Sequence, residues 1–119
     1  MLRITILIVP SELTPHVLTD VGLERVRQEE IGEGWRAKGT DWRSCADPAI
    51  DGGNFARATV LGEEYGEVCR AALEAQYAPT IGSAIEWRGR LRTELVQVAA
   101  VAVAWVEAID AEIAAGVGS

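Results

Sequence analysis

Residues 94–106 read Glu-Leu-Val-Gln-Val-Ala-Ala-Val-Ala-Val-Ala-Trp-Val, and this stretch decides the fold class. In a helix, residues 95–106 are apolar on every side except at Gln97. A helix that is hydrophobic all round is buried all round. A chain of 119 residues with three helices is too small to surround a central helix by itself. We therefore expect an all-α helical bundle that is completed by homo-oligomerisation.

The rest of the chain divides into helices separated by segments rich in glycine and proline. Thr14 followed by Pro15 is typical of a helix start, and Gly32 is expected to end that helix near Ile31. Asn54 is a candidate N-cap for a second helix. The expected elements are an arm over 1–13 with a possible strand at 2–9, helices over 14–31, 55–75 and 84–114 with a break near Gly89, and a loop over 32–54. We expect one domain over 1–119, with 14–114 as its helical core.

Charge and cysteine content exclude several classes of partner. The net charge of −7 argues against nucleic acid and against an anionic membrane surface. It does not argue against nucleotides, because a bound metal reverses the local field. Cys45 and Cys69 lack disulfide or metal spacing and are expected to be free thiols in a reducing cytosol. The apolar runs 4–9 and 98–106 are too short to span a membrane. The sequence therefore predicts a soluble, cytoplasmic protein.

Oxygen-bearing side chains recur at helical spacing in two segments. They are Glu63, Glu64, Glu67, Glu94 and Gln97. Residues three or four apart share a helix face, and like charges so placed destabilise a helix by roughly 0.2–0.5 kcal/mol per pair. A hard divalent cation such as Mg²⁺ or Mn²⁺ would remove that cost. The alternative is a solvated acidic patch stabilised by Arg70. The packed stripe of this second helix is expected at Leu61, Tyr65, Val68 and Ala72, with Glu64 at its edge, and Trp105 is expected in the core.

This pattern resembles the signature of the MazG-like, all-α nucleoside triphosphate pyrophosphohydrolases. In that family, Glu-Glu-x-x-Glu on one helix is followed by Glu-x-x-Asp on the next. Glu63, Glu64 and Glu67 complete the first half, whereas Gln97 stands where the family usually has Asp. The resemblance covers roughly residues 18–110. The segments that carry it are Glu24–Gln28, Gly34-Trp35, Glu63–Glu67 and Leu91–Trp105.

The resemblance implies an enzyme that cuts a nucleoside triphosphate to the monophosphate and pyrophosphate. It also implies a homo-oligomer, as a dimer or tetramer, since members of the family are dimers or dimers of dimers. Glu64, Glu67 and Glu94 would hold Mg²⁺ or Mn²⁺, with Gln97 as a weaker ligand or as a group that supports the ligands from behind. Glu63 would act as general base on the attacking water or hold a second metal. Small phage members, including those called MazZ, act on dGTP, so a purine deoxynucleotide is the expected substrate. The alternative role for Gln97 is an amide that fixes helix register at a subunit interface.

Aromatic and basic residues supply candidate contacts to the nucleotide. Trp35 and Trp42 could stack on the base, the alternative being that each plugs the helix core. The candidate phosphate contacts are Lys38, Arg43, Arg88, Arg90 and Arg92, of which Lys38 and Arg92 are preferred; the alternative for each is a solvated surface charge. Two other functions stay open: a non-catalytic helical oligomerisation module, in which the change from Asp to Gln has ended catalysis, and a pyrimidine (dCTP or dUTP) pyrophosphohydrolase.

Overall fold

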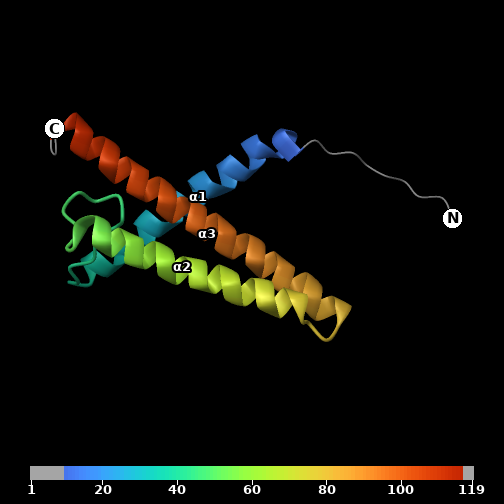
Figure 1. Cartoon of the computed structure of the whole chain (residues 1–119). Helices are drawn as coiled ribbons and strands as arrows, with labels where there is room; N and C mark the ends of the chain where they lie inside the picture. The colour runs from blue at the N-terminus through green and yellow to red at the C-terminus, as the bar shows by residue number, and fades with distance from the viewer. Residues whose placement is uncertain (1–9, 117–119) are drawn as a thin grey trace.

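The computed structural model describes residues 10–116 as three α-helices (Figure 1). The helices are α1 (Pro10–Ala37), α2 (Gly53–Gln76) and α3 (Ile81–Ala114). Helices α2 and α3 form a long antiparallel hairpin, and α1 packs across α3 at a steep angle. No strand occurs between residues 10 and 116, so the predicted all-α fold is confirmed. The strand predicted at 2–9 lies outside the described residues.

Helix α1 is longer at both ends than the sequence predicts. It begins at Pro10 and not at Thr14, so four residues of the predicted arm are helical and Pro15 lies inside the helix. This position is tolerated because Pro15 removes a single backbone donor close to the helix start. The carbonyl of Pro15 also accepts a hydrogen bond from Thr19 Oγ1 at 3.0 Å. At the other end, α1 continues past the predicted stop at Gly32 to Ala37.

Gly32 does not end α1, and the indole ring of Trp42 packs against it. Its backbone is buried against the side chain of Trp42. A Cβ atom placed on residue 32 would lie 1.7 Å from Cζ3 of Trp42. Any side chain at this position would therefore displace the indole. The glycine that looked like a helix breaker fixes where the loop after α1 returns to the helices.

The α2–α3 hairpin has well-defined caps that differ in part from those predicted. Thr80 caps α3: Ser83 N donates to Thr80 Oγ1 at 3.0 Å, and Thr80 N donates to Ser83 Oγ at 3.3 Å. Helix α2 starts after Gly52, whose φ of 87° suits glycine. The predicted cap Asn54 lies instead in the first turn of α2. The predicted break near Gly89 is wrong, since α3 is continuous there.

Small side chains build the core. In the described part of the chain, the buried hydrophobic residues are Val21, Ala71, Ala100, Val101, Ala104 and Ala108. Alanines at the contacts allow helix axes to approach closely. The packed stripe predicted for α2 is displaced, since Ala71 is buried while Ala72 is exposed and Tyr65 is 62% exposed. Trp105, predicted in the core, is half-buried.

Many large apolar side chains stay outside this core. Within residues 95–106 of α3, Leu95 is 50% and Val106 is 56% exposed. Near the α2–α3 turn, Ile81 is 82% exposed. Helix α3 is thus buried along one side by α1 and α2, and the single chain does not supply the burial on every side that its sequence predicts. None of the helices within residues 10–116 is long and apolar enough to cross a membrane.

Candidate functional site

A cavity of about 190 Å³ lies where all three helices meet the loop over residues 38–52, and we call it the central pocket. Its lining residues are Arg25, Arg27 and Gln28 of α1, Trp42, Ser44 and Cys45 of the loop, Val60 and Glu64 of α2, and Gln97, Val101 and Ala104 of α3. Glu64 and Gln97 reach this pocket from the two arms of the hairpin. An indole, two amides and a carboxylate thus share one cavity, which suits a small planar ligand with polar edges.

A second, smaller cavity of about 50 Å³ follows along the hairpin, and we call it the distal hollow. It is lined by Glu67, Arg70 and Ala71 of α2 and by Trp87, Arg90 and Glu94 of α3. Glu67 lies one turn beyond Glu64 on α2, and Glu94 lies one turn before Gln97 on α3. The four predicted metal ligands are therefore divided in pairs between two neighbouring cavities. Glu63, the predicted general base, is exposed and lines neither.

The central pocket crowds negative charge around Glu64. Partial burial raises the pKa of the Glu64 carboxyl, and the nearby carboxylates of Glu94, Glu67, Glu24 and Glu63 raise it further, in that order. A cation placed among these groups would oppose the shift. As the side chains lie, no three His, Cys, Asp or Glu residues within 10–116 converge on one metal position.

Glu24 is a site residue that sequence reasoning did not single out. It is buried, and the Arg27 guanidinium donates to both of its carboxylate oxygens, with Nε 3.1 Å from Oε1 and 2.5 Å from Oε2. This pairing raises the pKa of Arg27, and the nearby carboxylate of Glu64 raises it further. The spacing Glu-x-x-Arg on one helix was a usable signal. It gave no hint that α1 carries this acid next to the carboxylates of the hairpin.

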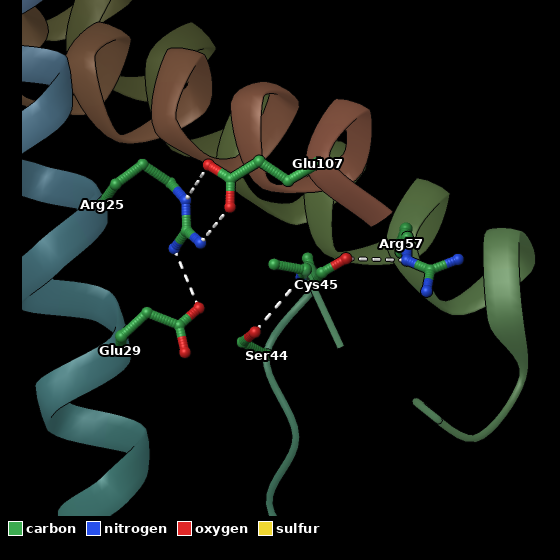
Figure 2. Close-up of polar contacts among 7 residues, drawn as sticks. Arg25, Glu29, Ser44, Cys45, Arg57 and Glu107 are labelled. Atoms are coloured by element: carbon green, nitrogen blue, oxygen red, sulfur yellow. Dashed lines mark hydrogen bonds and ion pairs between the residues drawn. The ribbon is translucent and has the colours of Figure 1, made fainter. Parts of the chain in front are cut away.

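The loop over residues 38–52 is fastened by Arg57, which is only 1% exposed. Its Nε donates to the carbonyl of Cys45 at 2.7 Å (Figure 2), and its Nη2 donates to the carbonyl of Asp47 at 2.9 Å. Nη1 donates to Asn54 Oδ1 at 2.9 Å, and Trp105 Nε1 donates to the same oxygen at 3.0 Å. Arg57 thereby holds the loop that carries Trp42 against α2 and α3.

Arg25 fastens α1 to α3 beside the pocket. Its guanidinium donates to both carboxylate oxygens of Glu107, at 3.2 and 2.9 Å, and lies 3.0 Å from Glu29 (Figure 2). The hydrogen bonds to Glu107 are the main reason that the pKa of Arg25 is raised, and those to Glu29 add to it. A bidentate pair of this kind fixes orientation as well as distance. The crossing of α1 over the hairpin is therefore set by charge as well as by packing.

The predicted nucleotide contacts fall into two groups. Trp42 lines the central pocket, whereas Trp35, Lys38 and Arg92 line neither the pocket nor the distal hollow. The Lys38 ammonium lies 5.3 Å from the Trp35 ring centroid at the end of α1. Arg92 donates to Asp20 at 2.5 Å, and this hydrogen bond lowers the pKa of Asp20. In the single chain, the three are engaged away from the carboxylates.

Comparison of this chain with models of protein families, with curated proteins and with solved structures gave no match. The family resemblance carried by residues 63–67 and 94–97 therefore stays a prediction. Any proposal of function rests on the shapes, charges and contacts of the two cavities.

Proposed function

We propose that the protein is a metal-dependent nucleoside triphosphate pyrophosphohydrolase, which converts a (d)NTP and water to the (d)NMP and pyrophosphate. The substrate we propose is a purine deoxynucleotide such as dGTP. One observation carries the proposal: a half-buried carboxylate, Glu64, is crowded by other carboxylates at the edge of a pocket that presents an indole and two amides. Partly burying a carboxylate among other carboxylates lowers the stability of the fold. The same arrangement can hold a cation beside a base.

The donor set fits Mg²⁺ or Mn²⁺ in its chemistry. Carboxylate and amide oxygens are the ligands that these hard cations prefer, and Glu64, Glu67, Glu94 and Gln97 lie on neighbouring turns of one hairpin. Because these four residues line two cavities, their side chains would have to rotate to reach one ion. Bound there, the metal would supply positive charge against the phosphates and the leaving pyrophosphate.

The residues of the chain would divide the remaining work. Trp42, seated on Gly32, would stack on the base. The amides of Gln28 and Gln97 line the same pocket and would meet the polar edge of the base. Glu63 is exposed next to the carboxylates and would take a proton from the attacking water as general base. The assembly we propose is a cytosolic homo-oligomer, because the large apolar side chains on α2 and α3 need cover.

The second candidate is a non-catalytic helical oligomerisation module. Two observations favour it: large apolar side chains stay exposed, and Gln97 brings no charge to the proposed metal position. Gln97→Asp separates the candidates, because a fourth carboxylate facing the metal should raise Mn²⁺ affinity in the enzyme. If Gln97 instead sets helix register between subunits, the variant should weaken assembly and leave Mn²⁺ affinity unchanged. Calorimetric Mn²⁺ titration alongside sizing of the same variant gives the answer.

The direct test of the enzyme is pyrophosphate release from dGTP, dATP, dCTP and dUTP with Mg²⁺, with Mn²⁺ and with chelator. We expect release that needs metal and is fastest with a purine. Glu67→Gln should abolish it while the fold is retained, because one ligand charge is lost. Glu86→Gln is the matched control, since Glu86 is exposed on α3 and lines neither cavity. Absence of release from all four nucleotides, or undiminished release by Glu67→Gln, would count against the proposal or the site. Faster release from dCTP or dUTP would instead support the pyrimidine enzyme.

A further inference from the structure

We propose that the distal hollow is the phosphate subsite: Arg70 and Arg90 bind the phosphate chain of a nucleoside triphosphate whose base lies against Trp42 in the central pocket. The inference rests on the proposed function and deepens it by giving the nucleotide a direction along the hairpin. Glu64, Glu67 and Glu94 would then lie between the two ends of the ligand.

The cations of the two cavities differ in whether they are already paired. At the central pocket, Arg25 is held by Glu107 and Arg27 by Glu24. At the distal hollow, neither Arg70 nor Arg90 forms an ion pair with another described residue, although two carboxylates line the same hollow. Three other basic residues also form no ion pair with a described residue: Arg36, Lys38 and Arg88. Arg70 and Arg90 differ from them because they line the same hollow as two of the predicted metal ligands. They are free to bind phosphate oxygens, which a planar guanidinium does in a bidentate manner.

One of the two guanidinium groups is held in place before any ligand arrives. The Arg90 guanidinium carbon lies 4.7 Å from the centroid of the Trp87 ring, which is a cation–π contact. The ring restricts a side chain that would otherwise move freely, so less entropy is lost when Arg90 binds an anion. Because Arg90 covers the Trp87 ring, this indole is not available to a base, unlike Trp42 in the central pocket.

The cavity volumes and the helix rise agree with this direction. The central pocket is nearly four times the volume of the distal hollow, about 190 against about 50 Å³, so the larger group of the ligand belongs there. From Glu64 to Arg70 the helix advances by about 9 Å at a rise of about 1.5 Å per residue. The order along the hairpin is therefore base pocket, carboxylates and then arginines, which is the order of base, metal-binding phosphates and terminal phosphate in a bound nucleotide.

Calorimetric titration in Mn²⁺ tests this with two probes, dGMP and the non-hydrolysable α,β-methylene analogue of dGTP. In the wild type we expect the analogue to bind at least about tenfold more tightly, since charge-assisted contacts of this kind are strong. The double variant Arg70→Gln/Arg90→Gln should lose most of that difference while its affinity for dGMP is unchanged. Arg88→Gln is the control, because Arg88 lies between Trp87 and Arg90 in the sequence but lines the groove near the α2–α3 turn and not the distal hollow. All of these side chains are exposed, so the fold should be retained, and thermal unfolding checks this.

An unchanged preference for the analogue in the double variant would overturn the inference. It is also overturned if Arg27→Gln, and not the double variant, removes the preference, because the phosphates would then lie in the central pocket. The proposed function is tested separately by pyrophosphate release. If the double variant still releases pyrophosphate with an unchanged KM, the proposed enzyme activity stands and the proposed phosphate subsite is wrong. If the wild type releases no pyrophosphate but the double variant loses the preference for the analogue, the phosphate subsite stands and the proposed enzyme activity is wrong.

Discussion

The two ends of the α2–α3 hairpin are held in different ways. At the end near the loop over 38–52, Arg57 binds backbone carbonyls and Arg25 joins α1 to α3, so polar contacts of defined geometry enclose the central pocket. At the end near the α2–α3 turn, residues 72–91 bear a shallow groove of alanine, isoleucine and leucine side chains that nothing in the described part of the chain covers. At the first end, contacts within one chain enclose the pocket, whereas we propose that another subunit covers the groove at the second. The central pocket and the proposed assembly surface are therefore separate regions of one hairpin.

The largest effect is expected from Arg57→Leu, which removes the fastening of the loop. The Cys45 carbonyl would lose its donor, which costs roughly 1–3 kcal/mol for a buried group, whereas the Asp47 carbonyl would keep its hydrogen bond from Ile50 N. With the hydrogen bond to Asn54 also lost, we expect a loss of about 3 kcal/mol in the free energy of unfolding. Urea unfolding measures it. Arg43→Leu is the control, since Arg43 makes exposed ion pairs to Asp41 and Asp47, and such pairs contribute at most about 1 kcal/mol. Equal losses in the two variants would mean that the loop is not held by Arg57.

The second largest effect is expected on assembly, from Ile85→Glu in the groove near the α2–α3 turn. Ile85 is exposed and lines the groove near the turn. If another subunit covers this groove, the charge should weaken the assembly by about 10- to 100-fold, the equivalent of the roughly 1.5–3 kcal/mol gained by burying such a side chain. Light scattering across a dilution series measures it. A wild-type chain that is already a folded, soluble monomer at micromolar concentration would show that the second end needs no cover.

The third prediction concerns the negative charge of Glu64 at the central pocket. Because the pKa of Glu64 is raised in the folded chain, folding becomes less favourable as the pH rises from the usual value of 4.5 through the raised pKa. Glu64→Gln removes that penalty, so without metal the variant should unfold at a higher temperature than the wild type at pH 7. The difference should shrink to nothing below pH 4.5, where the carboxyl is protonated in both states. Glu86→Gln should show no such gain, and a gain for Glu64→Gln that persists in acid would point to packing instead of charge.

The smallest effect is expected from Arg92→Gln. The Arg92 side chain is largely exposed, and its pair with Asp20 should contribute about 1 kcal/mol or less. Because Arg92 lines neither cavity, nucleotide affinity should not change either. Calorimetry with the α,β-methylene analogue of dGTP measures this. A tenfold loss of affinity would restore Arg92 as a phosphate contact, as the sequence indicates, and would extend the site toward α1.

Sequence patterns were sufficient for the helices that are ordered by their own caps and periodicity. Helix α2 differs from its predicted bounds by two residues at its start and one at its end, and α3 starts three residues early because Thr80 caps it. The ends of α1 were missed because Thr14-Pro15 is typical of a helix start and Gly32 is typical of a helix end. Gly32 packs against the ring of Trp42, which is ten residues further along the chain. A contact of that kind leaves no local signal.

Three of the predicted glutamates line the two cavities, whereas the residues that hold the loop and α1 in place were not predicted. Repeating glutamates at helical spacing identified Glu64, Glu67 and Glu94, which line adjoining cavities of one hairpin. Arg57 was missed because its partners in the loop are backbone carbonyls, which every residue has, so no residue type marks them. The separation of Glu64 and Gln97 from Glu67 and Glu94 was missed because it depends on how the two helices are aligned, which a single-helix pattern does not contain.

Arg57 also separates the anchoring of the loop from the chemistry that the loop presents. It holds Cys45 by the carbonyl, while Cys45 also contributes to the lining of the central pocket. The loop is thus anchored by backbone atoms, which all amino acids have, whereas the cavity is shaped by side-chain atoms, which differ between amino acids. A different residue at position 45 would alter the pocket wall without loosening its attachment. The loop can therefore change what the pocket selects while its path stays constant, which makes ligand preference adjustable by single substitutions.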